Sequence, residues 1–331
     1  MNALIVGFGK IGKIRYEIIR KKNFIKKIFF FDPYQKKINK NQNCLKSLKS
    51  LENYNIDIAF VCVPTYLAAS ITESLILKNI NVFCEKPPSV NSGQLLKLKK
   101  ILKKRPKVKL MYGFNHRYHP SIIKILEIIN SKEYGNILWI RARYGKPIDK
   151  NYIDGWRGKI KKSGGGILID QGIHILDLLV LFLGKIKRLY SILNNNFIKK
   201  NIEDNAFIIL ENYKKQSGSL HSTLTQWRHL FAIEIFFEKG FLVLNGLKTP
   251  SGSYGDEILT YGKNSEKIPK IKWNKIKKIR FKRDISFYNE TNHFLNMVLK
   301  NKKIHTSNID DAINVMKILE KIYKQNAKIF I

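Results

Sequence analysis

In the first third of the chain, short apolar runs alternate with segments in which apolar residues recur every three or four positions. Short runs are typical of buried strands, and the periodic segments are typical of helices with one apolar face. Strands are expected at residues 2–6, 28–32, 57–63, 81–85 and 108–113, with helices at 11–22, 67–78 and 91–104. Strands that alternate with helices predict right-handed βαβ units and a parallel sheet with helices on both faces.

After about residue 120 the pattern changes. We expect a helix at 120–130, a strand at 137–144, a glycine-containing loop and an apolar helix that ends at Leu183. Strand-like runs then follow with no helix between them, at residues 186–194, 205–212, 217–226, 231–237 and 241–244. This spacing predicts an antiparallel or mixed sheet. Two helices close the chain, at 286–300 and 309–324, and Asn308 is the expected N-cap of the second.

The length of 331 residues is that of two domains, and the change of pattern places their boundary near residue 118. We therefore expect a doubly wound α/β domain over 1–118 and an α/β domain over 119–331.

The net charge of +36 would ordinarily suggest a nucleic acid or an anionic membrane as partner. Most of the cations are lysines, however, and Ile and Asn are also abundant, as expected from a genome rich in A and T. The basic stretches 21–27, 97–109 and 275–283 come with no nucleic-acid-binding motif, so a nucleic-acid binder is the weaker hypothesis. A hydrophobic fraction of 44% excludes a wholly disordered chain.

Cysteines and apolar segments indicate the compartment. The three cysteines form no CxxC pair, which argues against a disulfide framework and fits a reducing environment. The N-terminal apolar run is too short for a signal peptide. The longest apolar stretch, 167–183, carries Asp170, His174 and Asp177, which argues against a membrane helix. We expect a cytoplasmic protein.

A glycine-rich turn follows the first strand and opens the first helix. Its residues are Gly7, Phe8, Gly9, Lys10, Ile11 and Gly12. In this context the GxGxxG spacing predicts a dinucleotide site: the first glycine permits the turn, the second lets the backbone approach a pyrophosphate, and the third packs helix on strand. Asp32 ends the next strand, where a carboxylate binds the adenosine ribose and favours NAD over NADP. Lys36 and Lys37 lie close enough to weaken that preference. The alternative is a glycine-rich turn without a ligand.

Two further clusters carry candidate chemistry. Lys86 lies in Glu85-Lys86-Pro87 at the end of the fourth strand, where ligands of parallel sheets bind, and a partly desolvated lysine can exchange protons with a hydroxyl. Asp170 and His174 are four residues apart, so on a helix they share a face and the carboxylate can orient the imidazole as a general acid or base. The alternatives are a structural histidine or a metal site with Asp177; only His174 is a strong transition-metal donor, so we expect no metal.

Taken in order along the chain, these motifs resemble those of the Gfo/Idh/MocA family, the glucose–fructose oxidoreductase and inositol dehydrogenase relatives. The motifs are 7–12, 85–87, Gly-Phe-Asn-His-Arg-Tyr-His-Pro at 113–120, the block from Gly164 to Asp177, and Tyr288, Glu290, His293 and Phe294. The resemblance implies a Rossmann domain followed by an α/β domain whose large open sheet often mediates dimers or tetramers. The sequence departs from the family pattern at Ala68, where many relatives have a histidine.

The resemblance also implies roles for individual residues. Lys86, Asp170 and His174 would be the catalytic set, with Pro64, Thr65, Glu85 and Lys86 lining the cofactor site in addition to the glycine turn and Asp32. Asn115, Arg117, Trp156 and Arg157 would contact substrate together with Asp170 and His174, with arginine suited to an anionic group, although a packing or salt-bridge role is equally open for these four.

The sequence therefore predicts an NAD(P)-dependent oxidoreductase that transfers a hydride between nicotinamide and a carbinol of a sugar, polyol or nucleotide-sugar. It would work as a homodimer or homotetramer, without a nucleic-acid or membrane partner. The alternative is a non-catalytic sensor that binds a dinucleotide on the same fold.

Overall fold

The computed structural model describes residues 1–34, 43–49, 51–264 and 272–327. By compactness the chain divides into unit 1, residues 1–115 and 287–317, and unit 2, residues 116–286 and 318–331. The segment 287–317 thus belongs with unit 1, although it follows nearly all of unit 2 in the sequence. The functional boundary near residue 118 stays a prediction, and the two units are described separately below.

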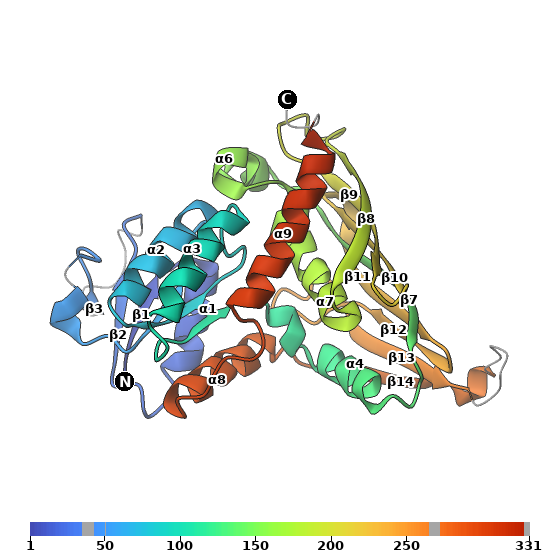
Figure 1. Cartoon of the computed structure of the whole chain (residues 1–331), viewed down its shortest axis with the longest axis horizontal. Helices are drawn as coiled ribbons and strands as arrows, with labels where there is room; N and C mark the ends of the chain where they lie inside the picture. Colours follow the sequence, from blue (N-terminus) through green and yellow to red (C-terminus); the bar gives the residue numbers. More distant parts are fainter. Residues whose placement is uncertain (35–42, 50, 265–271, 328–331) are drawn as a thin grey trace. The chain divides into compact units, whose positions relative to one another are not determined.

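Unit 1 contains a six-stranded sheet in the order β3-β2-β1-β4-β5-β6, and each neighbouring pair is parallel (Figure 1). The strands are β1 Asn2–Val6, β2 Lys27–Phe31, β3 Asn43–Cys44, β4 Ile58–Val61, β5 Asn81–Cys84 and β6 Leu110–Tyr112. The helices between them are α1 Lys10–Ile19, α2 Thr65–Leu77 and α3 Ser92–Lys103, with a short 3₁₀ turn at Leu51–Tyr54. The predicted doubly wound fold is confirmed; only β3, two exposed residues, had no sequence signal.

The core of unit 1 is completed from the C-terminal part of the chain. Phe294 of α8 (Ser286–Leu299) packs edge-on against Phe60 of β4 and Phe83 of β5, with ring centroids 5.7 and 5.6 Å apart. All three rings are fully buried. The last helix, α9 (Ile309–Gln325), begins with the predicted cap: Asn308 Oδ1 accepts from the backbone N–H groups of Asp310 and Asp311.

Unit 2 contains an eight-stranded sheet in the order β14-β13-β12-β11-β7-β10-β9-β8, in which only the β7–β10 pair is parallel among the described strands. The strands are β7 Ile137–Pro147, β8 Ile186–Asn194, β9 Asn205–Asn212, β10 Ser217–Thr223, β11 Thr225–Phe237, β12 Gly240–Asn245, β13 Glu257–Lys263 and β14 Lys277–Phe281. The predicted mixed sheet is confirmed.

Three local predictions in unit 2 were wrong. The strand expected at 217–226 ends at Thr223, and β11 runs unbroken from Thr225 through the segment expected to be separate. β13 and β14 were missed because neither contains an apolar run: β13 buries Glu257 and Gly262 on either side of Leu259, and three of the five residues of β14 are basic. The glycine-containing loop also holds three short helical turns, α5 Lys150–Asp154, η3 Trp156–Gly158 and α6 Ile160–Ser163.

Helices cover one face of the sheet in unit 2. α4 (Pro120–Ser131) and α7 (Ile173–Leu183) lie on that side (Figure 1), and α7 is buried on nearly every side. Among the described residues, the stretch 160–183 is long and apolar enough to cross a membrane, but 83% of its apolar window is buried inside the protein. This stretch is therefore packed in the core of the unit.

The opposite face of the same sheet exposes large apolar side chains. Tyr190 and Ile192 of β8 lie directly opposite Ile209 and Phe207 of β9, and these four are between 46% and 68% exposed. On β7, Trp139 is also exposed and stacks on Phe236 with ring centroids 4.2 Å apart. We call these residues the outer-face patch. Large exposed apolar side chains gathered on one face of a sheet are typical of interaction surfaces.

Candidate functional site

The turn between β1 and α1 uses its three glycines differently. Gly7 has φ +86°, and a Cβ there would lie 2.4 Å from the carbonyl oxygen of Cys62. A Cβ at Gly12 would lie 2.1 Å from the carbonyl oxygen of Gly7, so helix and strand pack too closely for any side chain. A Cβ at Gly9, in contrast, would meet no atom within 4 Å. Packing thus explains two glycines, and the third leaves open space where a pyrophosphate is expected.

Asp32 ties the glycine turn to the end of β2. One carboxylate oxygen accepts from the backbone N–H of Phe8 at 2.8 Å and the other from that of Tyr34 at 2.9 Å. A carboxylate has about four acceptor positions, so two remain for ribose hydroxyls. Lys10 and Ile11 form the first turn of α1, whose free N–H groups suit phosphate. These residues fit a dinucleotide. Lys36 and Lys37 lie outside the described residues.

We expect Gly9→Ala to weaken NADH binding without loss of stability. The added methyl group meets open space in the protein but occupies the position predicted for the pyrophosphate. Gly12→Ala is the matched comparison, because its methyl group clashes with backbone and should lower the thermal unfolding midpoint. NADH fluorescence titration and thermal unfolding measure the two effects. Unchanged NADH affinity in a folded Gly9→Ala protein would contradict the assignment of this turn.

Pro64 and Thr65 start α2 directly after β4. Pro64 is the N-cap residue and half-buried, whereas Thr65 is buried. Because β4 neighbours β1, this helix start lies at the carboxyl edge of the sheet next to the glycine turn. Ligands of open parallel sheets bind at that edge, where the strand order reverses.

Glu85 follows β5 and enters a buried ion-pair network that sequence reasoning missed. Its Oε1 accepts from Arg15 Nε at 2.9 Å and Nη2 at 2.6 Å, and Glu290 Oε2 accepts from the same Nη2 at 2.6 Å. Thr291 Oγ1 adds a fourth contact at 2.8 Å. Burial alone would lower the pKa of Arg15, but the two carboxylates raise it above its ordinary value. We call these four residues the Arg15 network.

The sequence held a signal for this network. Gly12, Arg15 and Ile19 form the buried face of α1, so a charged residue occupies an apolar position of the helix. The predicted contact of Glu85 with the cofactor stays a prediction, since the contacts above bind its carboxylate to Arg15. Lys86 follows at the carboxyl end of the sheet, half-buried, and is joined to Pro87 by a cis peptide bond.

In unit 2, Asp170 and His174 lie where a π-helical turn, Leu168–Gly172, runs into α7. The two residues are 6% and 4% exposed. Such π turns are frequent at functional sites. Gly172 brings the turn close to the sheet, since a Cβ there would lie 3.2 Å from Ser222 of β10.

Glu203 holds the start of this helical segment and was also missed. Its carboxylate accepts from the backbone N–H groups of Gly166 at 2.8 Å and Leu168 at 2.9 Å, and from the Tyr323 hydroxyl at 3.0 Å. Burial raises the pKa of Glu203 to about 7, against the opposing effect of these donors. The hydrogen bonds from Glu203 to Gly166 and Leu168 fix the backbone just before Asp170.

The side chains around Asp170 and His174 come from several elements. Asp170 lies between Lys146 and Arg157, with N···O distances of 3.5 and 3.4 Å. The ring of His174 stacks on His116, with centroids 3.8 Å apart and planes 21° apart. The predicted orientation of His174 by Asp170 stays a prediction. Lys146 and His116 had no role in the sequence analysis, although His116 lies within one of its motifs.

The predicted substrate residues differ in their surroundings. Arg117 makes a buried bidentate ion pair with Asp177 at 2.6 and 2.7 Å, which is the salt-bridge alternative left open for it. Arg157 lies over the ring of Trp156 at 4.5 Å. Asn115 is buried and belongs to unit 1. Substrate contact by these four residues stays a prediction. Among the described residues no three His, Cys, Asp or Glu side chains are grouped to hold a metal ion.

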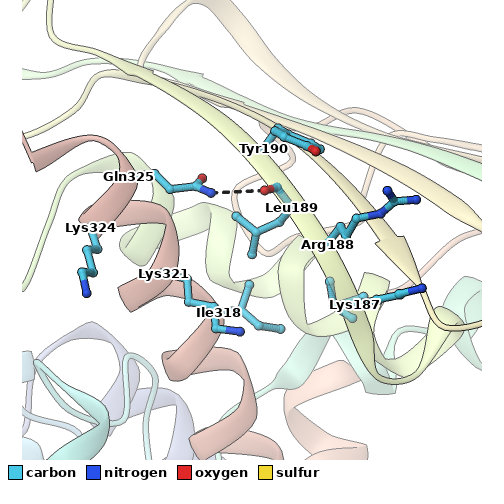
Figure 2. Close-up of a pocket in the computed structure, with 9 residues that line it drawn as sticks. Lys187, Arg188, Leu189, Tyr190, Ile318, Lys321, Lys324 and Gln325 are labelled. Atoms are coloured by element: carbon cyan, nitrogen blue, oxygen red, sulfur yellow. Dashed lines mark hydrogen bonds between the residues drawn. The ribbon is translucent and has the colours of Figure 1, made fainter.

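A cavity of about 570 Å³ lies between β8 and the C-terminal part of α9 (Figure 2). Gln325 crosses it to donate to the carbonyl oxygen of Leu189 at 3.2 Å. None of the predicted site residues lines this cavity. Its exposed lysines are what a chain of this composition places on any helix or strand surface, so the cavity adds nothing to the site.

Comparison with known proteins places both units in one family. A family model described as an oxidoreductase family with an NAD-binding Rossmann fold matches residues 1–114, and one for the GFO/IDH/MocA C-terminal domain matches residues 122–243. The two matches lie in the expected order along the chain.

Individual relatives are more distant. The myo-inositol 2-dehydrogenase of Thermotoga maritima is 24% identical over 78% of this chain and 79% of its own length, and the D-glucoside 3-dehydrogenase of Escherichia coli is 32% identical over 39% and 36%. The chain matches less than two thirds of the length of several curated relatives. A levoglucosan dehydrogenase structure with NADH and levoglucosan superimposes with TM-score 0.85 at 16% identity, covering 99% of this chain and 98% of that one, and shows the same fold. The chain belongs to the GFO/IDH/MocA oxidoreductase family.

Proposed function

We propose that this protein is an NAD-dependent oxidoreductase that transfers a hydride between nicotinamide and a carbinol of a sugar, polyol or nucleotide-sugar. The observation that carries the proposal is the glycine turn, in which Gly9 leaves open space that the packing of the protein does not require. Asp32 beside it favours NAD over NADP, because a carboxylate repels a 2′-phosphate. Relatives named as inositol and glucoside dehydrogenases support the substrate class.

The proposed mechanism is a reversible alcohol oxidation. The glycine turn and Asp32 would hold the dinucleotide, which supplies the hydride acceptor at nicotinamide C4 when bound. His174 removes the hydroxyl proton, Asp170 stabilises the imidazolium that forms, and Lys86 donates a hydrogen bond to the developing alkoxide. In the reverse direction His174 returns the proton to the carbonyl oxygen.

The test is a screen of sugars, polyols and nucleotide-sugars that follows NADH absorbance. We expect turnover with a member of these classes. If the protein binds NADH and turns over none of them, the alternative gains, namely a dinucleotide sensor on the same fold. The intact set of Lys86, Asp170 and His174 favours the enzyme.

We also propose a cytoplasmic homo-oligomer that associates through the outer-face patch. Ile209 is one of its exposed residues and lies directly opposite Tyr190 on the neighbouring strand. Ile209→Lys should shift a dimer or tetramer toward monomer, because a charge would be buried without a partner. Ile123→Lys is the matched control, since Ile123 is also exposed but lies on α4. Light scattering coupled to gel filtration gives the mass, and a monomeric wild type would refute the proposal.

A further inference from the structure

Two cations contact Asp170 at distances longer than those within the buried Arg117–Asp177 pair of the same unit. The Asp170 oxygens lie 3.5 Å from Lys146 Nζ and 3.4 Å from Arg157 Nε. The Arg117–Asp177 pair in the same unit has contacts of 2.6 and 2.7 Å, the length of strong charge-assisted hydrogen bonds. Lysine has three N–H donors and arginine five, and Lys146 and Arg157 each contact Asp170 through a single nitrogen, which leaves donors for a second anion.

Lys146 lies on the buried face of the sheet. Side chains alternate along a strand, so Lys146 follows Ala142 and Tyr144 on the face that α7 covers, and its side chain is only 15% exposed. Most of the described lysines lie on exposed faces, so composition does not explain this one. Its charge also lowers the pKa of His229, in addition to the effect of burial.

Aromatic rings accompany both cations. Lys146 Nζ lies 4.6 Å from the ring centre of Tyr152, and Arg157 lies 4.5 Å from that of Trp156. Asp149, a further carboxylate near Tyr152, caps α5 by accepting from the backbone N–H of Tyr152 at 2.8 Å. One carboxylate, Asp170, therefore lies between two cations that rest on apolar platforms, an arrangement that suits an anionic ring compound.

We propose that Lys146 and Arg157 bind the carboxylate of a sugar acid, so that the substrate is a uronate rather than a neutral sugar. The inference rests on the proposed function, in which Asp170 and His174 serve the reacting carbon. Because both cations contact Asp170, the anion that they bind lies within a few bonds of that carbon. A carboxylate on the sugar ring satisfies this condition, whereas the diphosphate of a nucleotide-sugar lies farther away.

The experiment measures equilibrium binding to the NADH-loaded protein by calorimetry, with D-glucuronate against D-glucose and UDP-glucuronate against UDP-glucose. We expect glucuronate to bind at least about tenfold more tightly than glucose, the effect of one charge-assisted contact. Lys146→Met should abolish the preference, and Lys146→Arg should keep most of it. Lys187→Met, which removes an exposed cation from β8, is the control and should leave the preference unchanged.

Three results would overturn the proposal. The first is equal affinity for the acid and the neutral sugar, or binding of neither. The second is an equal loss of affinity for both sugars in Lys146→Met, which would make Lys146 a positioning residue for Asp170. The third is an affinity for UDP-glucose that equals the affinity for UDP-glucuronate and falls by as much in Lys146→Met. That result would mean that Lys146 and Arg157 bind the diphosphate and not the sugar carboxylate. NADH binding is measured first; its failure would refute the proposed function and this inference with it.

Discussion

Replacement of His174 by alanine should lower kcat/KM by about 10²- to 10⁴-fold, the range that general acid–base catalysis contributes. The imidazole is buried beside His116 and four residues after Asp170, where a carboxylate stabilises the charge that His174 gains when it removes the proton. NADH affinity should stay near that of the wild type, because the glycine turn that would bind the dinucleotide lies in unit 1. Steady-state kinetics on a substrate from the screen and NADH titration give the two numbers.

Lys86→Met tests which of the two candidate residues, Lys86 or His174, is the base. If His174 is the base, kcat/KM of the wild type falls on the acid side of its pH profile and this limb disappears in His174→Ala. Lys86→Met should then lower the rate without removal of the limb. The opposite pattern would make Lys86 the base.

Control variants separate a loss of catalysis from a loss of folding. His305→Ala and Lys104→Met replace exposed residues of the same types and should turn over like the wild type. His174→Gln fills more of the space that alanine leaves and should be equally slow. Full turnover in both Lys86→Met and His174→Ala would refute the mechanism.

Arg15→Met should lower the free energy of unfolding by about 3–5 kcal/mol, the usual cost of removing one member of a buried ion pair. The variant would leave Glu85 and Glu290, which are both buried, without the cation that lies between them. Urea unfolding followed by fluorescence measures the change. Arg20→Met is the matched control on the same helix, because the Arg20–Glu17 pair is exposed and its loss should leave the midpoint unchanged.

A second variant separates charge from packing. Arg15→Met with Glu290→Gln removes one of the two orphaned charges and should recover part of the loss. An unchanged unfolding midpoint in Arg15→Met would mean that the Arg15 network contributes nothing to stability.

The sequence was sufficient for the architecture where burial leaves an apolar pattern. β1 and β4 are buried on both faces, so their runs are continuous, and β8 and β9 were predicted with their observed bounds. β14, Lys277–Phe281, has three basic residues among its five and is recognisable only by its pairing with β13. Such pairing depends on tertiary contacts that no local pattern contains.

The candidate site could be predicted by residue type but not by partner. The glycine turn is local, so its spacing alone indicated which glycine faces open space. The two carboxylate partners of Arg15 are 70 and 275 residues away, and that of Arg117 is 60 residues away, so these ion pairs have no sequence signature. Lys146 was missed because the predicted strand ends at residue 144, whereas β7 continues to Pro147 and places Lys146 on the same buried face as Tyr144.

Residues 287–317 belong to unit 1 but are synthesised after most of unit 2, so unit 1 cannot complete its core until late in synthesis. At about 5–20 residues per second, Glu290 leaves the ribosome roughly 14 to 55 s after Arg15. For that time the nascent first unit carries an arginine that lacks one of its two carboxylates, and Phe60 and Phe83 lack the ring that covers them. The unit whose synthesis starts first is therefore completed among the last, and a chaperone that binds early apolar surface has a defined target in it.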